Sequence, residues 1–491
     1  MESTQKQKSI KKNYIYNSTY LIISFLVQLC TAPYVSRILH DDGVGISSVV
    51  VANVSYFTLF GMLGIAGYAQ REGAILRDDK KKLSVFFWEL QLLHTIMLTL
   101  ALVPYVFLIL NAKKFGLYYV ISLVTIAASL FDISWMLQLN ERFDTIAIRN
   151  ITVQVMLFIA TFTLIKDKSD LPIYVGLTGT ATLISNVSMW FEVRKLLTKV
   201  KLSELKPFRH MKDVLIFFVP SIAASIYSYF DKTLISLITE SDKENGYYEQ
   251  AYKIYLIAAS VVQSLSTVSV PRMAHIFAHG TKKEFNDRLN ASLRFMVFIA
   301  VPSAFGMAGI AYRFVPFYFG EMFRPVTRII YVFAPILLIS GFNVYLDGMY
   351  LTAIGQKMKG AITVCIGSVV NLILNVLFIS LFSAIGAALA TLISESLICV
   401  AMFYHARASL EGKSIVKWLL KYGTAGILMF GIVFYTGTVI SNSWICIIVQ
   451  FMAGFISYSV VLLIEKDDLY IDIMKAVLIS LRIMKPEIKD K

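Results

Sequence analysis

An aspartate and a lysine stand side by side inside a long apolar stretch of the chain. They are Asp231 and Lys232, in "VLIFFVPSIAASIYSYFDKTLISLI" (214–238). A charge at the bilayer centre costs roughly 2.5–3.5 kcal/mol on insertion scales, so a membrane protein keeps one only where it has a partner or a use. Neighbouring residues on a helix point about 100° apart. The two charges therefore cannot neutralise each other, and at least one needs a different partner.

Two explanations fit the lysine. Lys232 lies within reach of the predicted outer end of its apolar stretch, so its stem can snorkel to the surface or its ammonium can join a structural ion pair. Alternatively, Lys232 faces an internal cavity and offers a cation to an anionic substrate. Asp231 is then expected to hold a cation in place rather than to contact the anion.

Further basic residues sit at the ends of apolar stretches. They are candidates for the same anion site, and the competing explanation is that they anchor the chain at lipid headgroups. These residues are Arg37, Arg71, Lys253 and Arg272.

Other polar residues interrupt the apolar stretches. Glu89, Asp132 and Asp347 lie toward the predicted cytoplasmic side and are candidates for gate ion pairs, whereas Glu395 is near mid-span and is a candidate proton or sodium site. His94 titrates near neutral pH when unperturbed, although an ordinary hydrogen-bonded histidine explains it as well. Four tyrosines can stack on sugars, or simply mark membrane interfaces: Tyr227, Tyr229, Tyr252 and Tyr255.

Composition defines the class of protein that must position these residues. Of the 491 residues, 57% are hydrophobic and 16% are charged, and the mean hydropathy is +0.67. Soluble domains carry about 25% charged residues, so the chain is predicted to be a polytopic membrane protein. The four cysteines fall within apolar runs without metal-like spacing, which indicates packing residues.

Apolar runs long enough to cross roughly 30 Å of hydrocarbon occur fourteen times. Their length and lack of alternation predict helices rather than barrel strands. The predicted spans are 15–37, 44–69, 84–110, 116–139, 146–165, 171–191, 214–238, 251–271, 291–312, 326–347, 361–382, 384–405, 418–440 and 444–464.

Lysine and arginine orient these spans. The N-terminal tail and every second connection carry 35 of them, the opposite connections carry 10, and Lys232 lies inside a span. The positive-inside rule therefore places both termini in the cytoplasm. The same distribution accounts for the net charge of +14, so the charge gives no indication of a nucleic-acid partner.

A weak internal repeat suggests two lobes. A shift of 201 residues superposes Arg71, at the inner end of span 2, on Arg272, at the inner end of span 8. Transporters commonly consist of such repeats, with the substrate between them. We predict an N-lobe (1–200, spans 1–6), a C-lobe (201–410, spans 7–12), two added helices (411–465) and an amphipathic cytoplasmic tail (466–491). The cavity is expected between spans 1, 2, 7 and 8.

Five motifs, in order along the chain, resemble the Wzx-type polysaccharide-export flippases, of the superfamily that includes lipid II flippases and multidrug and toxin extruders. One departure is His40, where the family commonly has glycine. The motifs are "PYVSRILHDDGVG" (33–45) with "LGIAGYAQREGA" (63–74), "FDISWMLQLNERFDTIAIRN" (131–150), "GYYEQAYKI" (246–254), "VSVPRMA" (268–274) and "VVNLILNVLFISLFSAIGAALATLISE" (369–395).

The resemblance implies a function. Such a protein moves an undecaprenyl-diphosphate-linked oligosaccharide from the inner to the outer leaflet for capsule, exopolysaccharide, O-antigen or teichoic-acid assembly. The diphosphate and glycan cannot cross hydrocarbon alone, because both would lose water. The expected partners are this lipid, the bilayer and a polysaccharide polymerase or other assembly proteins.

The sequence shows no cofactor motif and no enzyme signature. Without a nucleotide motif, coupling to an H⁺ or Na⁺ gradient, to membrane potential or to product removal all stay open. The alternatives are an ion-coupled multidrug or toxin antiporter of the same fold, and a membrane polysaccharide polymerase. The short outer loops argue against a polymerase, and the abundance of central lysine and arginine argues against a carrier of organic cations.

Overall fold

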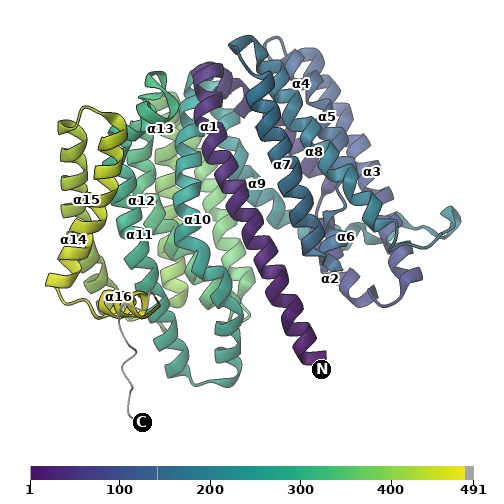
Figure 1. Cartoon of the computed structure of the whole chain (residues 1–491). Helices are drawn as coiled ribbons and strands as arrows, with labels where there is room; N and C mark the ends of the chain where they lie inside the picture. Colours follow the sequence, from purple (N-terminus) through teal and green to yellow (C-terminus); the bar gives the residue numbers. More distant parts are fainter. Residues whose placement is uncertain (1, 141, 481–491) are drawn as a thin grey trace. The chain divides into compact units, whose positions relative to one another are not determined.

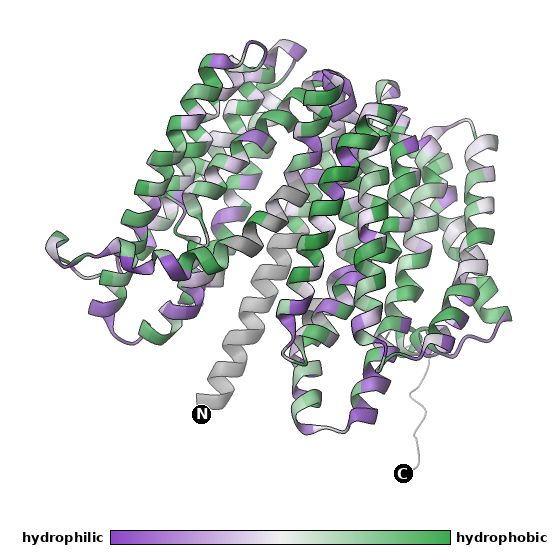
Figure 2. Cartoon of the chain, turned by 180° about the vertical axis from the view of Figure 1, so that it is seen from behind, coloured by the Kyte–Doolittle hydropathy of each residue, from purple (hydrophilic) through white to green (hydrophobic). Residues whose placement is uncertain are grey.

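The computed structural model describes residues 2–140 and 142–480, and these residues are almost entirely helical. The fourteen predicted spans all fall on helices, as an apolar segment with its backbone hydrogen bonds satisfied internally requires. Within the described residues, ten helices are long and apolar enough to cross a membrane. Of the ten, Lys357–Ala406 contains two predicted spans, and Ile23–Leu76 contains the second span and the part of the first from residue 23 onward. The predicted spans 171–191 and 214–238 lie on helices that are not among the ten. In Figure 2 hydrophobic residues cover the middle of the long helices, and hydrophilic residues gather at their ends.

The structure divides into two compact units, residues up to Glu249 and residues from Gln250 onward, and each is described by itself. The boundary differs from the predicted lobe boundary at residue 200, because α9 (Met211–Thr239) packs on α1 and α2 of the first unit. The division into two six-helix lobes stays a prediction.

The first unit contains the predicted spans 1–7. Spans 1 and 2 are joined into one helix, α1, which breaks at His40 (φ 60°, ψ −177°), and α2 continues span 2 beyond Leu63. Span 4, expected as a single helix, is three short ones, α4, α5 and α6. The helices are α1 (Glu2–Met62), α2 (Ile65–Leu76), α3 (Lys80–Asn111), α4 (Gly116–Ile121), α5 (Leu123–Leu130), α6 (Ser134–Leu139), α7 (Phe143–Leu164), α8 (Leu171–Val193) and α9.

Two apolar clusters hold the first unit together. One packs aromatic residues of α3 and α6, including Phe87 and Trp135, against α2. The other packs Tyr105 and Tyr119 against residues of α1 on both sides of its break, such as Val35 and Val54. α1 contacts α3, α7 and α9, so this helix connects most of the unit.

The second unit contains most of α10 and the helices that follow it. Its core joins α11, α12 and α14 around buried residues such as Met296, Tyr345 and Tyr422. The short helix α16 lies crosswise at the ends of α14 and α15 (Figure 1). The helices are α10 (Asp242–His279), α11 (Lys282–Phe319), α12 (Val326–Tyr345) with a π-helical turn (Leu346–Thr352), α13 (Lys357–Ala406), α14 (Gly412–Val439), α15 (Ser443–Ile464) and α16 (Asp468–Ser480).

An ionic cluster holds the start of α16 against α11 and α14. Arg294 of α11 donates hydrogen bonds to Asp468 at 2.6 and 2.8 Å and to Asp467 at 2.9 Å. Lys421 of α14 lies 2.9 Å from Asp467. The hydrogen bonds from Arg294 lower the pKa of Asp468 from 3.8 to about 2. The predicted position of 466–491 along the cytoplasmic surface stays a prediction.

Candidate functional site

The adjacent charges of α9 have separate partners. The Lys232 ammonium lies 2.6 Å from Oε2 of Glu249, and the Tyr248 hydroxyl donates a hydrogen bond to Oδ2 of Asp231. Asp231 and Lys232 are only 4% and 7% exposed. Because neighbouring side chains on a helix point in different directions, each charge contacts a different residue at the start of α10.

A serine of α1 completes this arrangement. The Ser48 hydroxyl donates to Oε2 of Glu249 at 2.9 Å, the same oxygen that meets Lys232. We call Ser48, Asp231, Lys232, Tyr248 and Glu249 the Lys232 cluster. It connects α1, α9 and the first turns of α10 through buried charge-assisted hydrogen bonds, which are stronger than neutral ones.

Two glycines bring α1 and α10 into backbone contact beside the cluster. A Cβ atom at Gly45 would overlap the carbonyl oxygen of Asp242, and one at Gly246 would overlap the carbonyl oxygen of Asp41. The Tyr247 hydroxyl donates to Oδ2 of Asp41 at 2.8 Å across the same contact. Only glycine permits helices to approach this closely.

The contact between α1 and α9 continues beside the cluster. Thr233 donates to Asn53 at 2.9 Å, Asn53 donates to the Tyr119 hydroxyl at 2.6 Å, and the hydroxyls of Tyr56 and Thr233 are 3.2 Å apart. These bonds satisfy polar groups that would otherwise be costly at membrane depth.

A second buried cluster forms around Glu89 of α3. Its carboxylate, 0% exposed, accepts a hydrogen bond from the Lys206 backbone at 2.7 Å. Its Oε2 lies 2.9 Å from Nε2 of His210 and also pairs with Arg209. The Tyr68 hydroxyl meets Nδ1 of His210 at 2.8 Å. Glu89 was predicted to pair with basic residues near the inner gate; it does pair with them, and the gate function stays a prediction.

The remaining predicted cations differ in their exposure. Arg37 and Arg71 are exposed, and Nε of Arg71 lies 3.6 Å from its neighbour Glu72. Arg272 is exposed and Lys253 is half-buried, both in the second unit. Their roles in substrate binding stay predictions.

The other predicted gate and coupling residues are dispersed. Oδ1 of Asp132 accepts a hydrogen bond from the Ser134 backbone at 3.0 Å, just before α6, and Glu395 accepts from Asn343 at 2.6 Å. Among the described residues, Oδ1 of Asp347 and Nε2 of His94 are buried without a hydrogen-bond partner. No group of three potential metal ligands gathers within that part of the chain.

The predicted sugar-contacting tyrosines have different surroundings. The Lys232 ammonium lies 5.9 Å from the centre of the Tyr229 ring. Tyr255 is 8% exposed, stacks on Phe333 at 5.2 Å and neighbours Tyr252 at 5.9 Å, which is a packing role in the second unit. The side chain of Tyr227 lies outside the described residues.

Glu249, Tyr248 and Ser48 are not among the predicted site residues. A signal for the first two existed in the hairpin of α9 and α10. Asp231 and Lys232 lie eight or nine residues before Glu240, and Tyr248 and Glu249 lie eight or nine after it. Helices folded back at a tight turn place equidistant residues side by side.

Long apolar helices with charged side chains buried between them define a polytopic membrane protein. The chain belongs to the family described as "Polysaccharide biosynthesis protein", whose model matches residues 10–277, more than half of the chain. This confirms the predicted family.

Individual relatives are distant. "Putative O-antigen transporter" of Escherichia coli K12 is 23% identical over 81% of this chain and 97% of its own length. "Probable low-salt glycan biosynthesis flippase Agl15" of Haloferax volcanii is 24% identical over 55% of this chain, and the match spans 58% of that relative. These relatives are named as transporters and flippases, in agreement with the prediction of a protein that is not an enzyme.

Solved structures confirm the fold. The lipid II flippase MurJ in an inward closed conformation matches 93% of this chain and 99% of its own, with a TM-score of 0.74 and 17% identity. A multidrug resistance transporter of the MATE family in an inward-facing conformation matches 83% of this chain with a TM-score of 0.58 and 15% identity. The predicted fold class is therefore confirmed.

Proposed function

We propose that this protein flips an undecaprenyl-diphosphate-linked oligosaccharide from the inner to the outer leaflet of the cytoplasmic membrane by alternating access. Support comes from the family, from relatives named as an O-antigen transporter and a glycan flippase, and from the MurJ-like fold. Polymerases and other assembly proteins would then use the flipped product.

The Lys232 cluster is the observation that carries the mechanism. Under the predicted topology it lies near the outer ends of spans 2, 7 and 8, where it holds these helices together. We propose that it closes the pathway toward the outside. Opening separates Lys232 from Glu249, and the released ammonium becomes available to the diphosphate of the substrate.

A drug antiporter of the same fold would need acidic groups available to an organic cation. In the Lys232 cluster both carboxylates are already matched, Glu249 by Lys232 and Ser48 and Asp231 by Tyr248. This pairing favours the flippase over the antiporter.

The test is export by Lys232 variants in cells whose own copy of the gene is deleted. Lys232→Ala is expected to accumulate lipid-linked oligosaccharide on the inner leaflet. Lys232→Arg keeps the charge but replaces a compact ammonium with a planar fork, so partial export is expected. Lys113→Ala, at an exposed position on the same predicted side, is the control, and protein abundance is measured alongside. Normal export by Lys232→Ala would refute the proposed role.

Orientation is tested separately by cysteine labelling in intact cells. We expect Ser241→Cys to react with an impermeant reagent and Ser203→Cys to be protected. The reverse result would place the Lys232 cluster on the cytoplasmic side and overturn the assignment of an outer gate.

A further inference from the structure

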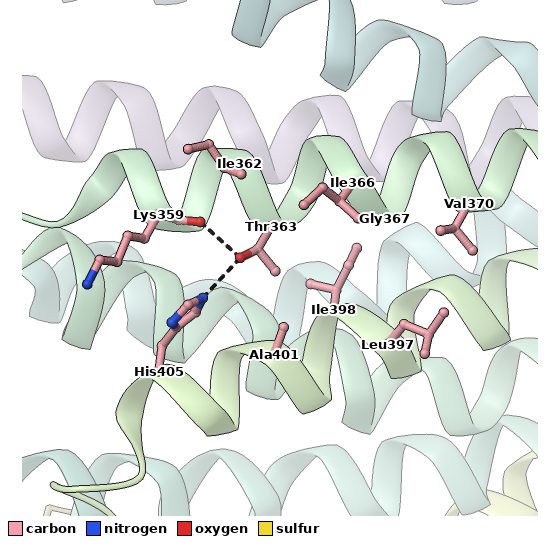
Figure 3. Close-up of a pocket in the computed structure, with 10 residues that line it drawn as sticks. All are labelled: Lys359, Ile362, Thr363, Ile366, Gly367, Val370, Leu397, Ile398, Ala401 and His405. Atoms are coloured by element: carbon pink, nitrogen blue, oxygen red, sulfur yellow. Dashed lines mark hydrogen bonds between the residues drawn. The ribbon is translucent and has the colours of Figure 1, made fainter.

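A groove runs between the two limbs of α13, which folds back on itself at Ser383 (φ 52°, ψ −133°). Its volume is about 470 Å³, and it lies wholly within the second unit (Figure 3). It is lined by Lys359, Ile362, Thr363, Ile366, Gly367, Val370, Leu397, Ile398, Ala401 and His405.

The polar groups of the groove gather at one end. The Thr363 hydroxyl donates to the Lys359 carbonyl at 2.9 Å and lies 3.3 Å from Nε2 of His405. Figure 3 shows these three residues together, with the apolar side chains continuing away from them. The groove therefore has an ammonium and an imidazole at one end and hydrocarbon along the rest.

The walls and floor suit a hydrocarbon chain. Ile362 and Ile366 are 52% and 61% exposed, so they face outward from this unit. In the floor, a Cβ atom at Gly367 would overlap the side chain of Ile398, and glycine therefore lets the two limbs approach. Exposed aliphatic residues on a membrane-spanning helix are expected to meet lipid.

Length and orientation define the occupant. From Lys359 to Val370 the helix rises by about 16 Å at 1.5 Å per residue, which is one leaflet of a core roughly 30 Å thick. The predicted topology places the polar end at the cytoplasmic surface. A groove that stops at mid-membrane matches one lipid of the inner leaflet. It does not suit the tail of a flipped substrate, because that tail would have to follow its headgroup into the outer leaflet.

We propose that this groove binds one acyl chain of an anionic glycerophospholipid of the inner leaflet, with its phosphate at Lys359 and His405. The positive ammonium complements the phosphate, and Thr363 fixes the imidazole beside it. The site is separate from the residues proposed to move the substrate, so the lipid is a resident ligand of the second unit.

Native mass spectrometry of the full-length protein, titrated with phosphatidylglycerol, tests the proposal. We expect Lys359→Gln to weaken retention of one lipid about fivefold, the effect of one basic residue near an anionic headgroup. Ala401→Phe should abolish that retention by filling the groove. Lys417→Gln, an exposed lysine at the same predicted membrane face, should leave it unchanged.

Thermal unfolding identifies any variant that loses lipid merely because it is misfolded. If Ala401→Phe is misfolded, Lys359→Gln decides the test, because a substitution at this exposed position should leave the fold intact. Equal retention by the wild type and both groove variants would overturn the site. Equal binding of phosphatidylcholine and phosphatidylglycerol would overturn the anionic headgroup. Displacement of phosphatidylglycerol by undecaprenyl phosphate, lost in Ala401→Phe, would overturn the resident lipid and assign the groove to the substrate tail.

Discussion

The ion pair between Lys232 and Glu249 allows a double-mutant cycle. At 2.6 Å between Nζ and Oε2, the direct attraction is about 6 kcal/mol for an effective dielectric of 20. Most of this attraction offsets the free energy lost when both charges leave water. A protein with an uncharged pair of similar shape should therefore be nearly as stable. Removing one partner alone leaves a buried charge and costs about 3–5 kcal/mol.

Lys232→Met and Glu249→Gln are therefore each expected to lower the melting temperature of the purified protein. A loss of about 3 kcal/mol corresponds to roughly 6–12 °C for a unit of this size. The double variant should regain most of that loss. Because the two residues are in contact, their effects should be strongly non-additive.

The pair between Lys114 and Asp242 is the matched control. It joins the same unit at 2.8 Å, but its lysine side chain is 53% exposed. Exposed pairs contribute at most about 1 kcal/mol, so Lys114→Met and Asp242→Asn should couple weakly. Additive losses for Lys232→Met and Glu249→Gln would show that the buried pair does not form.

Measuring export by the same variants distinguishes two proposed functions of Lys232: closing the gate through Glu249, and contacting the diphosphate. A double variant that is stable but does not export would support a need for the ammonium beyond closing the gate. A double variant that is stable and exports normally would refute the proposed contact with the diphosphate.

Three further predictions concern backbone conformation and pH. His40 occupies a region of φ and ψ that is essentially restricted to glycine, and this conformation costs another residue about 1–3 kcal/mol. His40→Gly should therefore stabilise the protein by about 1 kcal/mol, once the greater entropy loss of glycine on folding is subtracted. An unchanged melting temperature would contradict this. Gly246→Ala places a methyl group on the carbonyl of Asp41, so melting temperature and export should both fall; retention of both would refute the close helix contact. The pKa of Asp468 is lowered from 3.8 to about 2 by Arg294, so the docking of α16 is fully stabilised above about pH 4 and weakens as the pH falls toward 2. Hydrogen exchange of α16 over this range measures the loss, and an equal acid response in Arg294→Gln would contradict the cause.

Much of the fold follows from local sequence. Hydropathy predicted segments that are all helical in the structure, because the need to satisfy backbone groups inside hydrocarbon acts on each segment separately. The same local argument could not predict that span 4 breaks into α4, α5 and α6, since such breaks depend on packing against neighbouring helices.

The sequence also indicated that at least one of Asp231 and Lys232 needs another partner, because helix geometry separates adjacent side chains wherever the helix lies. Tertiary structure decided that the partners are Tyr248 and Glu249. The spacing about Glu240 indicates which residues of α9 and α10 lie at the same level, but how closely Gly45 lets α1 approach them is a long-range contact without a local signature. His40 illustrates both contributions. The resemblance to the flippase family shows from the sequence that histidine replaces the usual glycine. Its strained φ, however, exists only because the folded unit holds the two parts of α1 at that angle.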